Sequence, residues 1–298
     1  MCKRITRVLL SALYILLANS VFSQSVRPYP MEEKSLLWKV QHPEQNGEIY
    51  LFGTMHLMEK AYFFFPKKLE KLVQKSDVLV MELAGMPNPM DAMKYILLPQ
   101  EVNFFDYFSP QQSDTILQWA QDKLRMDENT FRSSFSKMKP FAVVQMAVQM
   151  EFMGKTESYE LRFENIAKAS SVPVEGLETV ADQMGIFDRM TREQQSEMVM
   201  ESIREGDDEM DEIKKMQQIY TTQDLDALYA LIEQDGGFLE EIETELLTDR
   251  NANWAKQLVN YMDGRQVFVA VGAANLGGPN GLIRLLEAQG YLLTPVEL

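Results

Sequence analysis

Cysteine and histidine are nearly absent from this chain of 298 residues, which has one cysteine, Cys2, and two histidines, His42 and His56. Cys2 lies in a leader that we expect to be removed, so the remaining chain has no thiol for a disulfide and its stability must come from its core. His42 stands beside Pro43 in a polar turn, where we expect an exposed loop histidine. Imidazole chemistry in this protein therefore depends mainly on His56.

A basic surface is also missing. The 44 acidic residues outnumber the 29 basic ones, and the formal net charge is −15. A surface of this sign repels nucleic acid and anionic membranes, and it tolerates metal ions and cationic partners. The simplest reading of the charge is solubility. We expect no nucleic-acid partner.

The first 23 residues have the pattern of a secretory signal peptide. Lys3, Arg4 and Arg7 precede an apolar run at residues 8–18 that is too short to span a bilayer comfortably. Small residues follow, and cleavage near Ser23 would leave residues 24–298 as a single domain. We therefore expect a secreted or periplasmic protein that does not insert into a membrane after cleavage.

Two stretches at opposite ends of the chain share one order: an apolar strand, a glycine, a polar residue three positions later, an amphipathic helix and a second strand. The first begins with a strand at residues 48–52 and the second with a strand at residues 266–271. A strand–helix–strand connection of this length places its two strands in parallel. We predict an α/β fold of mixed α+β character, in which these two related halves form a central mixed sheet flanked by helices. A long helical insertion at about residues 90–260 joins the halves.

One segment of the insertion, residues 139–153, is apolar on nearly every side. Gln145 and Gln149 interrupt it, and it is shorter than a membrane span. We therefore predict a buried helix here and not a transmembrane one.

The turns after the first strand of each unit carry residues suited to chemistry. His56 comes three residues after Gly53, Asn275 comes three residues after Gly272, and Glu82 stands close to the end of the strand that closes the first unit. Ligands of open sheets gather at the carboxyl ends of strands, so we expect one imidazole, one carboxylate and one amide to converge on a shared edge. Such a set suits a divalent metal whose bound water becomes a nucleophile. The glycines would let the backbone approach closely and adopt a conformation closed to other residues.

Several motifs along the chain are specific in combination. They are Trp38-Lys-Val, Tyr50-Leu-Phe-Gly-Thr-Met-His56-Leu, Val78-Leu-Val-Met-Glu82-Leu, Lys139-Pro, Val174-Glu-Gly-Leu-Glu178-Thr with Gln183, Asp249-Arg250-Asn251 with Trp254, and Val269-Ala-Val-Gly272-Ala-Ala-Asn275-Leu-Gly-Gly-Pro-Asn-Gly281-Leu. Together they resemble the TraB/GumN family, which is grouped with the PrgY pheromone-shutdown proteins and the Tiki proteases. The resemblance covers essentially the whole chain after the leader.

This resemblance implies a fold related to the erythromycin-esterase and ChaN-like proteins, with a site built from paired Gly-x-x-His motifs. Tiki members are described as metal-dependent peptidases that act on secreted signalling proteins. His56 matches the first motif's histidine, Glu82 the acidic residue of the following strand, and Arg250 the arginine of the late helix. Asn275 stands where the family has its second histidine.

Asn275 is the main departure from the family pattern. The expected metal ligands are His56, Glu82 and Asn275, with Mn, Co or Zn as the ion, but an amide oxygen suits manganese or calcium better than zinc. Either the site binds a harder metal weakly, or another residue such as Glu178 completes it, or catalysis has been lost.

Three residues are candidates for catalysis, and each also has a structural reading. Glu82 is a metal ligand or general base, and it is also a candidate ion-pair partner of Arg250. Arg250 could hold a substrate carboxylate or an oxyanion, or could bridge to Glu82 or Glu178. Glu178 either joins the site or favours the start of the helix that follows it.

Two functions remain open from the sequence. The first is a secreted metal-dependent hydrolase, peptidase-like, that acts on a peptide or protein substrate. The second is a non-catalytic secreted protein that binds a peptide or another ligand on the same fold. The intact first Gly-x-x-His turn favours the first function, and Asn275 favours the second.

Overall fold

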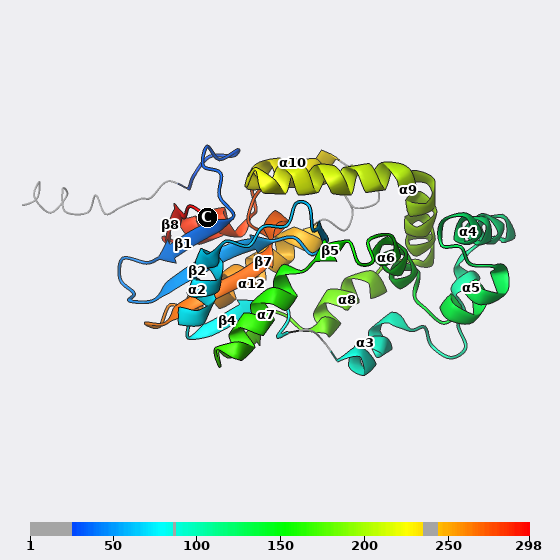
Figure 1. Cartoon of the computed structure of the whole chain (residues 1–298), viewed down its shortest axis with the longest axis horizontal. Helices are drawn as coiled ribbons and strands as arrows, with labels where there is room; N and C mark the ends of the chain where they lie inside the picture. Colours follow the sequence, from blue (N-terminus) through cyan, green and yellow to red (C-terminus); the bar gives the residue numbers. More distant parts are fainter. Residues whose placement is uncertain (1–25, 86–87, 235–243) are drawn as a thin grey trace, which may run out of the picture.

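The structure is a computed structural model that describes residues 26–85, 88–234 and 244–298. The predicted signal peptide lies outside the described residues, and so do positions 238–243 of a helix that the sequence predicts at residues 238–261. Within the described ranges, strands from both ends of the chain meet in one sheet, and helices from the middle of the chain lie beside it (Figure 1).

Six strands of the described chain form a mixed sheet in the order β6-β4-β7-β2-β1-β8. β6, β4, β7 and β2 are parallel to one another, whereas β1 runs antiparallel to both β2 and β8. All residues of β4 and the inner residues of β7 are buried and apolar, as expected for parallel strands covered on both faces. The strands are β1 (Leu37–Gln41), β2 (Glu48–Thr54), β4 (Val78–Met81), β6 (Val174–Gly176), β7 (Gln266–Gly272) and β8 (Leu292–Pro295).

Two helical connections leave the sheet toward opposite faces. The chain passes from β2 through α2 (Lys67–Lys75) to β4, and from β7 through α13 (Leu282–Ala288) to β8. These connections travel toward opposite edges of the sheet, and because such crossovers are right-handed, their helices cover opposite faces. α2 packs against α7 (Tyr159–Ala169), and α13 packs against α12 (Arg250–Leu258). The adjacent strands β2 and β7 therefore mark a topological switch point, where ligands of open sheets usually bind.

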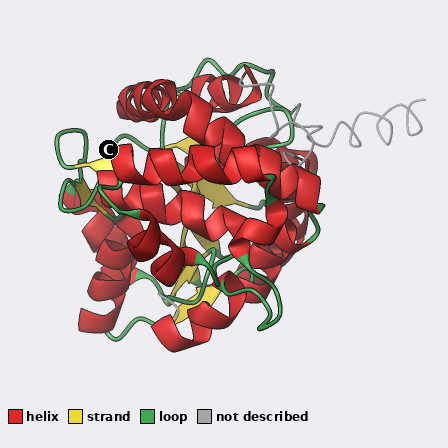
Figure 2. Ribbon diagram, turned by 90° about the vertical axis from the view of Figure 1, so that its right-hand side faces the viewer, coloured by secondary structure: helices red, strands yellow, loops and turns green. Residues whose placement is uncertain are grey.

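The middle of the chain forms a helical part that lies beside the sheet. In Figure 2 this helical part faces the viewer. Its own apolar core is rich in phenylalanine, including Phe104, Phe131 and Phe141. A short antiparallel pair, β3 (Met58–Glu59) and β5 (Thr156–Glu157), joins the turn after β2 to this part of the chain. The helices are α3 (Pro89–Ile96), α4 (Pro110–Lys123), α5 (Glu128–Phe135), α6 (Pro140–Glu151), α8 (Val180–Asp188), α9 (Arg192–Thr221) and α10 (Leu225–Gln234).

The apolar helix predicted at residues 139–153 corresponds to α6, but only its first turn is buried. Pro140 and the three residues after it lie in the helical core. Gln145, Val148 and Gln149 instead border a cavity, which explains why an apolar helix carries glutamines on one side. None of the described helices is long and apolar enough to cross a membrane.

The predicted fold class is confirmed: a central mixed sheet is flanked by helices, and both crossovers join parallel strands. The two strand–helix–strand units are not placed alike in the sheet. One strand separates β2 from β4, whereas two strands separate β7 from β8. The origin of the units as related halves stays a prediction, as does the assignment of residues 24–298 to one domain.

A buried ion pair fastens the chain before β1 to the C-terminal unit. Arg284 of α13 and Asp226 of α10 are 4% and 2% exposed, with 2.8 Å between Arg284 Nη2 and Asp226 Oδ2. Asp226 also accepts hydrogen bonds from the backbone N–H groups of Met31 and Gly278. One carboxylate thus ties together three segments that are distant in the sequence.

We expect Arg284→Ala to lower the free energy of unfolding by about 3–5 kcal/mol, because it leaves the Asp226 carboxylate buried without its charge partner. The matched control is Lys34→Ala, which removes a largely exposed ion pair with Asp224. That change should cost no more than about 1 kcal/mol. Urea unfolding of both variants tests the prediction, and equal effects would contradict it.

Candidate functional site

A cavity of about 900 Å³ lies where the carboxyl ends of the central strands meet the helical part. The turns after β2 and β7 and the end of β4 form its polar wall. The opposite wall is mostly apolar and includes Val148, Met184 and Phe187. The cavity therefore combines a cluster of charged groups with a large apolar surface.

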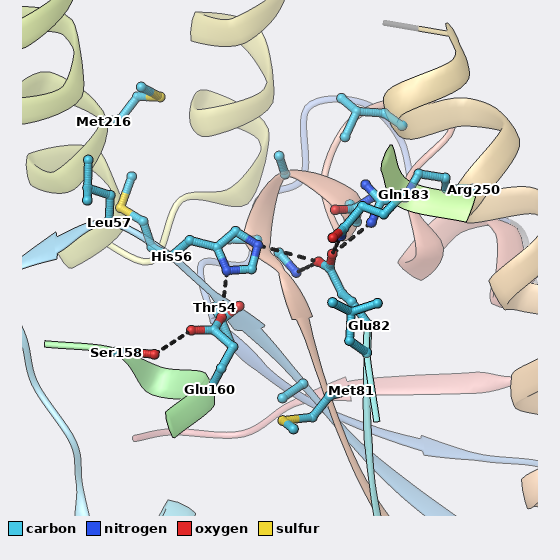
Figure 3. A pocket seen from close by; sticks show the side chains of 18 of the residues that line it. Thr54, His56, Leu57, Met81, Glu82, Ser158, Glu160, Gln183, Met216 and Arg250 are labelled. Carbon is cyan, nitrogen blue, oxygen red and sulfur yellow. Dashed lines mark hydrogen bonds and ion pairs between the residues drawn. The ribbon is translucent and has the colours of Figure 1, made fainter. Parts of the chain in front are cut away.

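His56 lies two residues after the end of β2, and its side chain is 62% exposed. Its Nδ1 atom lies 2.9 Å from Oε1 of Glu160, a residue in the first turn of α7. Its Nε2 atom faces Glu82 across 3.9 Å (Figure 3). The ring thus stands between two carboxylates, close to one and apart from the other.

Glu82 follows β4 directly and is 7% exposed. Its Oε1 accepts a hydrogen bond of 2.8 Å from the backbone N–H of Gly272, at the end of β7. Its Oε2 accepts bonds of 2.7 Å from Arg250 Nη2 and 3.1 Å from Gln183 Nε2. The buried carboxylate is therefore well satisfied, and Oε1 is the oxygen that also faces His56.

Arg250 is the first residue of α12 and connects Glu82 with Glu178. Its Nε and Nη2 atoms donate to the two oxygens of Glu178 at 3.0 and 2.6 Å, a bidentate pair. Its guanidinium also lies over the ring of Trp254, 4.5 Å from the centroid. The sequence left open whether Arg250 binds substrate or bridges to Glu82 or Glu178, and the structure shows the bridge, to both residues.

Asn275 closes the opposite side of the polar wall and is 3% exposed. Its side-chain amide donates 2.9 Å to Oδ1 of Asn251, whose own amide donates to the backbone oxygen of Asn280. This chain of amides turns Oδ1 of Asn275 toward Gly272. A Cβ atom on Gly272 would lie 3.0 Å from that oxygen and 3.3 Å from Oε1 of Glu82.

The glycines of the two turns are needed for close approach and not for an unusual conformation. A Cβ on Gly53 would meet the Cα of Ala273 at 3.0 Å. Gly272 has φ −52°, and Gly53 is not among the glycines of positive φ, so neither adopts a conformation closed to other residues. The sequence analysis gave two reasons for these glycines, a close approach of the backbone and an unusual conformation. The structure supports the first reason, and the second was wrong.

The charges of the site shift the pKa values of its members. The contact with Glu160 raises the pKa of His56 to about 9, against the opposing effect of partial desolvation inside the cavity. Burial favours a higher pKa for Glu160, but the proximity of His56 outweighs it and lowers the pKa to about 2. Burial raises the pKa of Glu178, although Arg250 opposes this. In the free protein, His56 and Glu160 are thus a charged pair at neutral pH.

The residues predicted for the site do lie together. His56, Glu82, Asn275 and Arg250 all line the one cavity, as the sequence predicted for the edge of the sheet. Glu178 is not among the residues that line the cavity, and it accepts hydrogen bonds from Arg250 and Gln183, which are. The catalytic and metal-binding roles of these residues stay predictions.

Glu160 is the residue that the sequence analysis missed. It lines the cavity and makes the shortest polar contact of His56. In the sequence it follows Ser158, the N-cap of α7, and an acidic residue in the first turn of a helix is common for reasons unrelated to a site. The pairing of β3 with β5, which brings the two residues together, has only two residues in each strand and leaves no periodic signal.

The donor set can be compared with the needs of a divalent metal. The described residues contain no group of three or more His, Cys, Asp or Glu that could hold an ion. The polar wall instead offers one imidazole nitrogen, one carboxylate oxygen and one amide oxygen. The 3.9 Å between His56 Nε2 and Glu82 Oε1 exceeds the about 3.3–3.6 Å that separates two ligands of a tetrahedral ion with bonds of about 2.0–2.2 Å, so the two atoms would have to move closer to share an ion. The carboxylate on Nδ1 matches the usual support of a metal-binding histidine, and the types of donor present, though not their spacing, suit an ion of intermediate or hard character.

The fold and site define an α/β protein with a cavity at the switch point of its sheet, which has one charged wall and one mostly apolar wall, and with a helical part beside it. A family model described as the TraB/PrgY/gumN family matches residues 36–295, and the chain belongs to that family. The comparison with curated proteins and that with solved structures found no match.

We expect an NMR titration of His56 to give a midpoint near 9, compared with 6.5 for an ordinary histidine. His42→Gln removes the other histidine signal. The stability that the pair contributes is complete between about pH 4.5 and 6.5 and is lost as the pH rises through 9. Over this window the wild type should therefore lose more stability than His56→Gln, although solvent at the exposed ring screens the effect. A midpoint near the ordinary value would contradict the pairing.

Proposed function

We propose that this member of the TraB/PrgY/gumN family is a hydrolase that cleaves a peptide bond in the cavity with the help of a divalent cation. The observation that carries the proposal is the convergence of His56, Glu82, Asn275 and Arg250 on one cavity. These residues come from segments far apart in the sequence and meet at the switch point of the sheet. Hydrolysis can use this combination of a water-activating group, a carboxylate and a fixed positive charge.

Each residue has a role that follows from its contacts. Nε2 of His56, Oε1 of Glu82 and Oδ1 of Asn275 would hold the cation, which lowers the pKa of a bound water and so supplies a nucleophile near neutral pH. Glu82 is the carboxylate of the cavity wall that would accept a proton from an attacking water and return it to the leaving amine, with Arg250, Gln183 and the N–H of Gly272 holding it in place. Arg250, fixed by Glu178, places its charge where the carbonyl oxygen becomes negative.

The apolar wall suggests what part of a substrate the cavity holds. A cavity of about 900 Å³ has room for several side chains of an extended peptide. Gln145 and Gln149 on α6 border it and offer amide groups to a peptide backbone. A peptide or protein segment with apolar side chains fits this surface better than a compact polar metabolite does.

We also propose that the protein acts outside the cytoplasm, after removal of residues 1–23. The support comes from the basic start and the short apolar run of this segment. The N-terminal sequence of the protein isolated from its cell envelope or medium tests this directly.

The wild type should bind Mn²⁺ or Co²⁺ in calorimetry and cleave members of a peptide library followed by mass spectrometry. His56→Ala should lower cleavage by about 100-fold or more, because it removes the nitrogen ligand. His42→Ala is the matched control, since His42 lies in the turn between β1 and β2 against Tyr291 and away from the cavity lining. The absence of metal uptake and of any difference in cleavage would end the hydrolase proposal.

A second function is favoured by one observation, the asparagine at position 275. If the cavity binds peptides but neither binds metal nor cleaves, the protein is a non-catalytic binding protein on the same fold. Calorimetry with the peptides of the same library separates this outcome from the first.

Asn275→His tests what the asparagine does to the metal preference. We expect the variant to bind Zn²⁺ about tenfold more tightly than the wild type, because a second imidazole suits zinc better than an amide oxygen does. Thermal unfolding first shows that the buried position accepts the larger ring. An unchanged Zn²⁺ affinity in a folded variant would mean that position 275 does not face the ion.

A further inference from the structure

The carboxylate of Glu160 has a close polar neighbour at each of its oxygens, and of these contacts the one at Oε2 has the geometry of a hydrogen bond. Oε1 lies 2.9 Å from Nδ1 of His56, and Oε2 accepts a hydrogen bond of 3.0 Å from the hydroxyl of Ser158. The side chain is 20% exposed, and Oε1 itself is shielded from solvent. Figure 3 shows it below the imidazole, on the side away from Glu82. A carboxylate held in this way has little freedom to follow a ring that moves.

The backbone on both sides of this contact is also fixed. β3 begins two residues after His56, β5 ends three residues before Glu160, and the two strands pair with Met58 opposite Glu157. The backbone N–H of Lys60 donates to the oxygen of Lys155 and extends the pairing.

The neighbour of Glu160 is anchored as well. Tyr159 is fully buried, and its hydroxyl donates 2.8 Å to the backbone oxygen of Phe64. The start of α7 and the turn after β2 are therefore one connected unit, and the position of Glu160 relative to His56 is set by the fold.

The orientation of the imidazole decides which of its nitrogens faces the cavity. His56 stands on a turn and is 62% exposed, so packing alone leaves its ring free to rotate. A carboxylate on Nδ1 leaves Nε2 to face Glu82, whereas a rotated ring would present a carbon or the wrong nitrogen. We propose that Glu160 is a positioning residue that holds the imidazole of His56 by Nδ1 and aims Nε2 at Glu82. Its effect on catalysis rests on the proposed function, but the contact itself does not.

The first test needs neither metal nor substrate. In ¹⁵N-labelled protein with His42→Gln, the proton on Nδ1 of His56 should give an NMR signal, because Glu160 protects it from exchange with water. The signal should persist in Glu157→Gln, which removes an exposed carboxylate from the same segment, and should vanish in Glu160→Ala. If Glu160→Ala does not fold, Glu160→Gln keeps the shape of the side chain, and its weaker acceptor should speed the exchange of this proton. A signal missing from the wild type, or unchanged in both Glu160 variants, would overturn the proposal.

The second test measures Co²⁺ binding by calorimetry. Loss of a carboxylate that supports a metal-binding histidine weakens affinity by about 10–100-fold, and we expect this range for Glu160→Ala. Glu160→Asp should recover part of the loss, and Glu157→Gln should bind as the wild type does. Equal affinities of Glu160→Ala and the wild type would overturn the positioning role. A wild type that takes up no Co²⁺ would count against the proposed metal-dependent function, and the NMR result would then decide the positioning role alone.

Discussion

The parallel pairing of β2 with β7 is the constraint on which the rest of the site depends. In this pairing Thr54 lies opposite Gly272, so the turns that carry His56 and Asn275 start at the same level of the sheet. Their connections then diverge to opposite faces and leave a space at the edge. A shift of the register by one residue would turn the N–H of Gly272 away from Glu82 and reverse the faces of every side chain in β7.

The buried charges beside this edge need an explanation beyond stability. The side chains of Glu82, Glu178 and Arg250 are 9%, 8% and 15% exposed. Removing such groups from water costs several kcal/mol for each ion, and the attraction between them offsets this only when the remaining polar atoms are satisfied. Gln183 and the N–H of Gly272 supply that satisfaction. Apolar residues of similar volume would stabilise the fold at least as well, so the network is best understood as the fixed base of a site.

The sequence was sufficient to predict the strands of the sheet, because the signals of these strands are local and strong. The apolar runs of β2, β4 and β7 and the glycines after two of them predict buried strands and tight turns without any knowledge of the fold. The site residues His56, Glu82 and Asn275 followed from one rule about the carboxyl ends of strands, together with the family resemblance. The cavity that they share confirms this step.

What the sequence did not show depends on contacts between distant segments. Glu160 looks like an ordinary first-turn acid of α7, and only the short β3–β5 pairing reveals its neighbour. α5 was not predicted, because its two buried phenylalanines, Phe131 and Phe135, stand among polar residues. α6 was predicted to be buried throughout, because nothing in its own sequence indicates that its second half borders a cavity.

The balance of charge in the network around His56 and Arg250 bears on the question that Asn275 raises. Within this network, which leaves out Glu164 on the same cavity, Glu82, Glu178 and Glu160 bring three negative charges, and Arg250 brings one positive charge. When His56 is protonated, one negative charge remains in excess. When His56 is neutral and its Nε2 could bind a metal, two negative charges remain in excess. A divalent ion carries the charge that would neutralise them. An imidazole and an amide at position 275 are both neutral ligands, so the exchange of one for the other leaves this balance unchanged. In the proposed metal site the asparagine would therefore alter which ion is preferred and how tightly it binds, but the excess negative charge that favours a cation would remain.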